Sequence, residues 1–264
     1  MTIHYMNGAG NDFMVMDARG GSYDFEKLAL ELCKLTGADG FMATDLSDKA
    51  DFRLHFYNAD GSRGEMCGNG SRCICRFAYD LGIAGENMSV ETDAGIVYGR
   101  RLDENNYAVQ LNNPGVVDLH RKADCAYIEL GDPGVPHAVK EVPGLDWSQK
   151  EQLRDMARAL RYDPAFPKGA NANLYTRLDE NTVRILTFER GVEDYTLACG
   201  TGSAGVALTL WAQGRLPENK LLAHNRGGDL MVTVEEDAAG QLRALFLEGP
   251  TETTNRYEYV ASAL

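Results

Sequence analysis

Two cysteines occupy matching settings in this chain. The stretch "MCGNGSRC" (66–73) places Cys67 directly before two glycines and an asparagine, where helical periodicity begins. The stretch "ACGTGSAG" (198–205) places Cys199 in the same setting 132 residues later. A helix N-terminus favours the thiolate form of a cysteine, and the N–H groups of the first helical turn bind anions. The repeated pattern therefore indicates two thiols that can exchange protons beside an anionic ligand.

Two such loops, if they face each other, could hold the carboxylate of an amino acid between two helix N-termini. Glycine lets a ligand approach the backbone closely, and Asn69 or Thr201 can add a side-chain hydrogen bond. One thiolate could then remove the α-proton while the opposite thiol delivers a proton to the other face. The N–H groups would stabilise the charge that develops on the carboxylate. This chemistry inverts the α-carbon and requires no cofactor.

Other uses of the cysteines fit less well. Cys67, Cys73 and Cys75 lack the spacing of a zinc site, and no paired ligands follow downstream, so no metal is expected. The glycine-rich stretches lack the Lys and Ser/Thr of a phosphate-binding loop. A thiol nucleophile for acyl transfer stays open, but it would leave the second matching cysteine unexplained. The cysteines within apolar periodicity are expected to be small core residues: Cys33, Cys73, Cys75 and Cys125.

The elements that must position these loops are mainly strands. Runs rich in β-branched and aromatic residues predict strands within 51–61, 88–100, 106–113, 182–191, 230–237 and 242–249. Apolar periodicity predicts helices within 24–36, 71–82, 148–161 and 203–214. Few of the strands are joined by crossover helices, so the pattern favours a mixed α+β fold.

The chain also repeats itself. "CGNGSRCICRFAYDLG" from Cys67 matches "CGTGSAGVALTLWAQG" from Cys199 at Cys, Gly, Ser and the apolar helix positions. Each block follows one predicted strand and precedes another, which indicates a duplication. We expect one half over 1–113, carrying Cys67 and completed by about the last ten residues, and a second over 114–264, carrying Cys199. Related by a pseudo-twofold axis, the halves would place one cysteine on each wall of a cleft.

Composition narrows the function classes. The chain has 264 residues, 44% of them apolar, and a net charge of −13, with 39 acidic against 26 basic residues. A folded core is expected, whereas nucleic-acid and anionic-membrane partners both select for basic surfaces. The N-terminal stretch lacks the pattern of a signal peptide, and no run is apolar enough for a membrane span. We therefore expect a cytoplasmic location with reduced thiols.

With these motifs in order, the chain resembles the diaminopimelate epimerase family of cofactor-independent two-cysteine enzymes. The resemblance covers essentially the whole chain. It rests on "NGAGNDF" (7–13), "TGADG" (36–40), "FYNADGSRGEMCGNGSRC" (56–73), "GANANL" (169–174) and "FERGVEDYTLACGTGSAG" (188–205). The family fold consists of two similar halves, each a β-sheet wrapped around a central helix. The resemblance implies an isomerase that interconverts LL- and meso-2,6-diaminopimelate for lysine and peptidoglycan-precursor biosynthesis, without cofactor, often as a homodimer.

The resemblance also assigns site residues by their positions in the motifs. Cys67 and Cys199 match the acid/base pair, with His137 and Glu189 beside the catalytic site: His137 could orient or tune Cys67, and Glu189 lies near Cys199. The residues matched to substrate binding are Asn11, Asn58, Gly68, Asn69, Asn171, Glu189, Arg190, Gly200 and Thr201. A guanidinium such as that of Arg190 can grip a carboxylate through two hydrogen bonds.

Three departures from the family pattern concern substrate recognition more than the chemistry. Val135 stands where the family usually has an asparagine that contacts the distal part of the substrate. Gly40 stands where some members have glutamine, and the spacing from Glu189 to Cys199 is one residue longer than usual. A two-cysteine racemase of another amino acid, such as histidine or another basic one, is therefore an alternative. A second alternative is a non-catalytic module that binds amino acids on the same scaffold.

Overall fold

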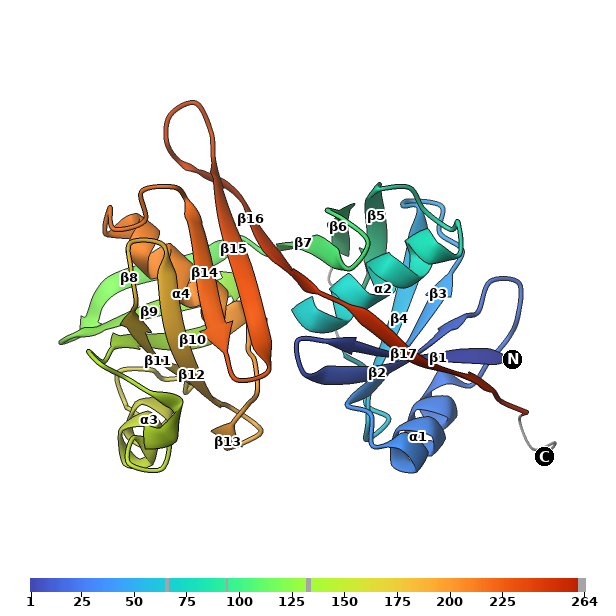
Figure 1. The fold of residues 1–264 in the computed structure, drawn as a ribbon, viewed down its shortest axis with the longest axis horizontal. Helices are drawn as coiled ribbons and strands as arrows, with labels where there is room; N and C mark the ends of the chain where they lie inside the picture. The colour runs from blue at the N-terminus through green and yellow to red at the C-terminus, as the bar shows by residue number, and fades with distance from the viewer. Residues whose placement is uncertain (65–66, 94, 132–133, 261–264) are drawn as a thin grey trace. The chain divides into compact units, whose positions relative to one another are not determined.

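The computed structural model describes residues 1–64, 67–93, 95–131 and 134–260 (Figure 1). Its contacts divide the chain into two compact units. The first contains Met1–Val109 and a C-terminal segment that begins at Gly249, and the second contains Gln110–Glu248. None of the helices in these described ranges has the length and apolar character that crossing a membrane demands.

The first unit is built on a mixed sheet that begins with the C-terminal strand. Neighbouring strands are antiparallel except for β2–β3 and β4–β5, which are parallel. The order is β17 (Glu252–Glu258), β1 (Thr2–Gly8), β2 (Asn11–Asp17), β3 (Gly40–Asp45), β4 (Phe52–Asn58), β5 (Asn87–Thr92), β6 (Gly95–Arg101) and β7 (Asn106–Leu111). The predicted strand over 88–100 is thus a hairpin of β5 and β6, and its residue 94 lies outside the described residues.

The second unit repeats this order and polarity. Its strands run β8 (Pro114–Lys122), β9 (Cys125–Gly131), β10 (Gly134–Glu141), β11 (Asn171–Arg177), β12 (Thr182–Glu189), β14 (Lys220–Asn225), β15 (Gly228–Glu236) and β16 (Leu242–Pro250), and the short β13 (Asp194–Tyr195) pairs with the end of β12. Again only the third and fifth neighbour pairs are parallel, β10–β11 and β12–β14. The predicted α+β fold of two similar halves is confirmed.

Each unit holds one helix that is almost wholly buried. These are α2 (Gly68–Asp80) and α4 (Gly200–Ala212), of 13 residues each. Both begin three residues earlier than predicted, because packing against the sheet overrides the weak helix propensity of their glycines. The glycines of the sheet let α2 pack close to the strands. A Cβ on Gly8 of β1 would lie 2.8 Å from the carbonyl oxygen of Asn69, so only glycine fits there without a shift.

Shorter helices cover the outside of each sheet. The first is α1 (Phe25–Thr36), capped by Asp24, whose side chain accepts a hydrogen bond from the N–H of Lys27. In the second unit the helix predicted over 148–161 is wrong in its first part: the chain forms a 3-10 turn, η1 (Trp147–Gln149), and then α3 (Arg154–Arg161). Residues 150–152 are Lys, Glu and Gln, so no apolar side chain holds that stretch as a helix against the core.

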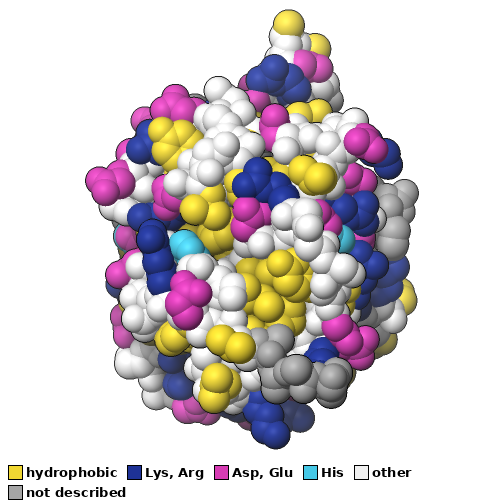
Figure 2. Space-filling model, turned by 90° about the vertical axis from the view of Figure 1, so that its right-hand side faces the viewer, with side chains coloured by type: hydrophobic (Ala, Val, Ile, Leu, Met, Phe, Trp, Pro, Cys, Tyr) yellow, Lys and Arg dark blue, Asp and Glu magenta, His cyan; other side chains and the backbone are white. Residues whose placement is uncertain are grey.

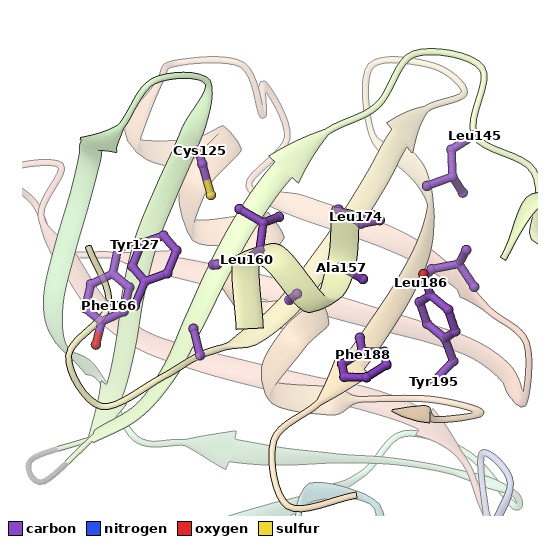
Figure 3. Packing of buried hydrophobic residues seen from close by; sticks show 13 residues of the cluster. Cys125, Tyr127, Leu145, Ala157, Leu160, Phe166, Leu174, Leu186, Phe188 and Tyr195 are labelled. Carbon is purple, nitrogen blue, oxygen red and sulfur yellow. The ribbon is translucent and has the colours of Figure 1, made fainter. Parts of the chain in front are cut away.

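The core of the second unit fixes the end of β12, where site residues follow. Phe188 of β12 meets Tyr195 edge to face at 5.5 Å between ring centroids, and Tyr127 stacks on Phe166 at 5.2 Å. Figure 3 shows these rings in one cluster with Leu160 of α3. Rings packed in this way restrict the backbone that carries them.

The four cysteines that are not at a helix start lie in the core, and charged side chains of both signs lie on the surface. Cys33, Cys73, Cys75 and Cys125 are all buried, which confirms their predicted place in the core. On the face of the molecule shown in Figure 2, acidic and basic side chains are interspersed around an apolar area near the centre. Neither acidic nor basic side chains gather in one patch on this face (Figure 2).

Candidate functional site

Cys67 is the residue immediately before α2. Its backbone is extended (φ −129°, ψ 117°), and its carbonyl oxygen accepts the first helical hydrogen bond from the N–H of Ser71 at 2.7 Å. This is the N-cap position, which precedes the N–H groups that a helix cannot pair internally. Cys67 is partly exposed, whereas Cys73 and Cys75 of the same helix are buried. The structure therefore confirms a thiol at a helix start.

A chain of polar side chains holds the first loop in place. Asn69 Nδ2 donates to Asn11 Oδ1 at 2.8 Å, and Asn11 Nδ2 donates to Asp39 Oδ2 at 3.1 Å. Asn11 follows a tight hairpin turn in which Ala9 and Gly10 both have positive φ, at 52° and 89°. The β1–β2 hairpin thus brings Asn11 to the N-terminus of α2. Two residues that the sequence assigned to substrate binding are in direct contact.

Arg72, which the sequence assigned no role, completes this chain from inside the helix. Its side chain is fully buried, and its Nη2 donates to Asn69 Oδ1 at 2.9 Å. Its Nη1 lies 3.4 Å from the carbonyl oxygen of Gly68. The guanidinium therefore folds back over the first turn of α2. The sequence does contain one indication of Arg72: the equivalent position of the second repeated block is Ala204, so the two blocks differ there.

Asn58 lies apart from this network. It ends β4, is exposed, and its Nδ2 donates to Ser62 Oγ at 3.0 Å. Its backbone N–H also bonds to Ser62, so the side chain closes a turn. Opposite it in the register is Gly40, where a Cβ would lie 2.9 Å from the carbonyl oxygen of Tyr57 and from the ring of Phe56. A glutamine at residue 40 would need this region to shift.

Cys199 repeats the arrangement of Cys67 before α4. Its φ and ψ are −126° and 108°, and its carbonyl oxygen accepts from the N–H of Ser203 at 2.9 Å. Its sulfur accepts from the N–H of Gly202 at 3.3 Å and lies 3.6 Å from Thr201 Oγ1. The second thiol is thus also at a helix N-terminus, and it is more buried than the first. Both predicted acid/base residues are N-cap residues.

A buried polar network supports α4 from beneath. Asn173 Oδ1 accepts from Thr187 Oγ1 at 2.9 Å, and Asn173 Nδ2 lies 3.2 Å from His137 Nδ1. A Cβ on Gly202 would lie 2.3 Å from Asn173 Oδ1 and 3.2 Å from the sulfur of Cys199. Asn173 thus sits directly against the loop. The sequence analysis missed it, although it follows Asn171 by two residues and must share a strand face with it.

His137 lies in the same unit as Cys199. Its side chain packs against Gly205, since a Cβ there would lie 3.5 Å from His137 Cβ. Burial, helped by the charge of Arg190, lowers the pKa of His137 to about 3. The imidazole is therefore neutral at physiological pH, and its Nε2 has no hydrogen-bond partner among the described residues. In that state it can orient its neighbours but adds no charge.

Glu189 is the last residue of β12 and Arg190 follows it, and the two side chains differ in burial. Glu189 is half-buried, and burial raises the pKa of its carboxyl, an effect that the nearby Thr196 side chain partly opposes. Arg190 is exposed. Its backbone N–H donates to Asn171 Oδ1 at 2.8 Å, and its Nη1 donates to the carbonyl oxygen of Lys168 at 3.0 Å. Asn171 therefore positions the backbone of Arg190, and the carbonyl oxygen of Lys168 holds one nitrogen of its guanidinium.

The third unusual residue, Val135, lies on β10 opposite Leu130 and is 39% exposed. An aliphatic side chain there offers no hydrogen bond. Near it, Glu129 of β9 accepts from Tyr127 and from Lys168 Nζ, the latter at 2.8 Å. Within the described part of the chain, no group of His, Cys, Asp and Glu is placed to hold a metal ion.

The structure thus assembles the predicted residues into two constellations, one in each unit. Asn11, Gly68 and Asn69 surround the helix start at Cys67. In the second unit, Gly200 and Thr201 are at the helix start of Cys199. His137, Asn171 and Glu189 lie on strands of the same sheet, and Arg190 directly follows β12. Asn58 alone has its side chain engaged in a turn.

Comparison with known proteins agrees with this arrangement. The family model described as diaminopimelate epimerase matches residues 3–117 and 131–252. A diaminopimelate epimerase of Hydrogenobaculum is 37% identical over 279 residues, covering 95% of both chains, and that of Aquifex aeolicus is 33% identical, covering 94% of both.

Solved structures share the fold at lower identity. A phenazine biosynthesis protein of the PhzF family from Bacillus anthracis has a TM-score of 0.74 at 14% identity, covering 99% of both chains. A probable proline racemase from Agrobacterium radiobacter has a TM-score of 0.69 at 15% identity, covering 99% of this chain and 93% of that one. Fold, duplicated loops and whole-length sequence similarity agree: the chain belongs to the diaminopimelate epimerase family.

Proposed function

We propose that this protein interconverts LL- and meso-2,6-diaminopimelate by moving a proton between Cys67 and Cys199. The observation that carries the proposal is the repetition of a cysteine at the N-cap of an equivalent buried helix in both units. The family membership supplies the substrate class. A duplicated acid/base group is what inversion at carbon requires, since the proton leaves one face and arrives at the other.

The proposed chemistry needs one cysteine as the thiolate and the other as the protonated thiol. The thiolate removes the α-proton, and the thiol on the opposite face donates its proton to the α-carbon. The two cysteines exchange states in each turnover, so the reaction runs in both directions. The N–H groups at Gly68, Asn69, Gly200 and Thr201 would bind the carboxylate of the reacting centre and stabilise the charge that develops on it.

The remaining residues are proposed to recognise the distal amino-acid end and to support the thiols. Arg190, held by Asn171, suits a carboxylate, and Glu189 suits an ammonium group or can take part in proton transfer. Asn11 acts through its bond to Asn69. His137, neutral and tied to Asn173, orients the catalytic surroundings. Asn58 would have to release Ser62 before it could contact substrate.

The central experiment is isotope exchange with matched cysteine variants. Incubation of the reduced protein with LL-diaminopimelate in D₂O should produce the meso form carrying deuterium at the α-carbon. Cys67→Ala and Cys199→Ala should each lower epimerisation by roughly 100-fold or more, because each removes the acid or base on one face. Cys33→Ala and Cys125→Ala are matched controls in the cores of the two units and should retain activity.

Two results would contradict the proposal. Full activity after replacement of either Cys67 or Cys199 would rule out the two-base scheme. A covalent substrate adduct on one cysteine, without deuterium incorporation, would favour a thiol nucleophile instead.

Val135 favours a second candidate, a racemase of another amino acid on the same catalytic pair. Its aliphatic side chain on β10 offers no hydrogen bond to a polar distal group. A screen of α-proton exchange across diaminopimelate, lysine, ornithine, histidine and arginine separates the candidates, because all share the reacting centre and differ in the distal group. Binding of an amino acid without exchange would instead indicate the non-catalytic module. We also propose a cytoplasmic location and, from the family resemblance, a homodimer.

A further inference from the structure

We propose that Glu193 is a positioning residue that fixes the turn carrying Arg190, so that the guanidinium is already in place when a substrate carboxylate arrives. This inference rests on the proposed function, in which Arg190 recognises the distal amino-acid end, and it adds the residue that prepares Arg190 for that task. Glu193 lies between Glu189 and Cys199, in the stretch that is one residue longer than the family pattern. It was not among the site residues predicted from the sequence.

The backbone after β12 turns sharply at Gly191 and Glu193. Their φ angles are 92° and 57°, and the N–H of Glu193 donates to the carbonyl oxygen of Glu189 at 2.8 Å. Glycine adopts a positive φ readily, whereas a residue with a side chain does so at a cost in free energy. Contacts of the surrounding structure must therefore offset the cost at Glu193.

The carboxylate of Glu193 provides such contacts, since it accepts four hydrogen bonds. Its Oε1 accepts from the backbone N–H of Gly191 at 3.0 Å and from Nε and Nη2 of Arg161 at 3.1 and 2.7 Å. Its Oε2 accepts from the hydroxyl of Tyr162 at 2.6 Å. These donors, Tyr162 above all, lower the pKa of Glu193 to about 2, so the group is ionised at neutral pH. The side chain thus ties the residue that follows Arg190 to the end of α3.

Arg161, the last residue of α3, also lies against the second segment that holds Arg190. Its side chain is 12% exposed, and a Cβ on Gly169 would meet its Nη1. Gly169 directly follows Lys168, whose carbonyl oxygen accepts from Nη1 of Arg190 at 3.0 Å. Arg161 therefore joins the segment at Lys168 to the turn at Glu193, and these two segments flank Arg190.

Fixing Arg190 in this way should strengthen the binding of a carboxylate. A long side chain on a loose turn loses conformational freedom when it closes on a ligand, and this loss weakens binding. A turn that is ordered before the ligand arrives avoids part of the loss. Because the distal end of the substrate takes no part in bond breaking, this gain is the same in the ground state and the transition state. It should therefore act on KM and not on kcat.

The neighbouring residue Asp194 provides a matched comparison. Its Oδ1 accepts from Nη1 of Arg154 at 2.8 Å, so it also joins this loop to α3 through an ion pair. Asp194 belongs to β13, however, and not to the turn between Glu189 and Glu193. Asp194→Ala removes an exposed, ion-paired carboxylate one residue away from Glu193. It separates the positioning of Arg190 from a general stabilisation of the loop.

The first test needs no substrate. Hydrogen–deuterium exchange of the Gly191 amide, followed by NMR, should be roughly 10-fold faster in Glu193→Ala than in the wild type, because the amide loses its acceptor. Glu193→Gln keeps an oxygen at this position and should restore most of the protection. Asp194→Ala should match the wild type at Gly191. Equal exchange in the wild type and in Glu193→Ala would overturn the proposal.

The second test is a double-mutant cycle of Glu193 and Arg190 in the epimerisation of LL-diaminopimelate. Glu193→Ala should raise KM roughly 10-fold and change kcat by less than about twofold, whereas Glu193→Gln and Asp194→Ala should stay near the wild type. In an Arg190→Met background, Glu193→Ala should change kcat/KM little, because Glu193 acts through Arg190. Additive effects of the two substitutions, or a loss in kcat in place of KM, would contradict the positioning role.

The two tests separate this inference from the proposed function. If the wild-type protein exchanges no α-proton of diaminopimelate, the proposed function fails, and the amide exchange of Gly191 still tests the hold of Glu193 on the turn. If the wild type epimerises diaminopimelate and Glu193→Ala leaves KM unchanged, the proposed function stands and the positioning role is wrong.

Discussion

Replacing His137 by leucine should make the fold less sensitive to acid. His137 is fully buried in the second unit, and burial lowers its pKa from 6.5 to about 3. The folded protein therefore excludes a proton that the unfolded chain accepts as the pH falls below 6.5. The stability that neutral His137 contributes is fully present above pH 6.5 and is lost as the pH falls toward 3.

The size of this effect follows from the pKa shift of His137. One pKa unit corresponds to about 1.4 kcal/mol, so the full shift corresponds to about 5 kcal/mol. Lowering the pH from about 8 to about 4.5 should lower the free energy of unfolding by about 2–3 kcal/mol. The carboxyl groups contribute equally in the wild type and in His137→Leu, so their contribution cancels when the two free energies of unfolding are compared. Asn173 Nδ2 keeps its bonds to the carbonyl oxygens of Ala138 and Asn171, so leucine leaves no buried donor unpaired.

The assay is urea unfolding at both pH values for the wild type, His137→Leu and His120→Leu. His120 is exposed on β8 and serves as the matched control, which should follow the wild type. The free energy of unfolding of His137→Leu should fall by about 2–3 kcal/mol less than that of the wild type over this range. Equal losses in all three proteins would refute the claim that His137 is held neutral by burial.

Two further predictions concern packing and alkaline pH. Gly202→Ala should destabilise the protein by about 1–3 kcal/mol and lower activity, because its Cβ would lie 2.3 Å from Asn173 Oδ1. Gly85 is exposed, so the control variant Gly85→Ala should change the melting temperature little. Equal changes of melting temperature in the two variants would contradict the contact between residue 202 and Asn173. Burial raises the pKa of Cys73 from 9.0 to about 12, so its contribution to stability is present below pH 9 and lost as the pH rises toward 12. Unfolding of Cys73→Ala at about pH 10.5 should therefore show about 2 kcal/mol less alkaline loss than the wild type, and an identical loss would argue against a protonated core thiol.

Much of the fold could be predicted because the sequence contains the same pattern twice. The blocks that start at Cys67 and Cys199 predict two equivalent helices, and the structure confirms both, with the thiols at their N-caps. The strands that the sequence analysis missed include β1, β2, β9 and β10. Several of these carry glycine or polar site residues and gain their pairing from partners distant in the chain, as β1 does from β17. Local periodicity carries little information on such pairing.

What the sequence by itself determined is the identity of the proposed reacting groups, since two thiols at repeated helix starts can be recognised without knowledge of the packing. Only the tertiary structure decided how they are supported. Three contacts depend on where strand pairing and burial place the side chains. They are those of Asn69 with Asn11, of Asn173 with Thr187, and of Arg72 with the first turn of α2. Burial also decides the charge of His137 and of the core cysteines, because desolvation depends on the surrounding atoms and not on neighbours in the chain.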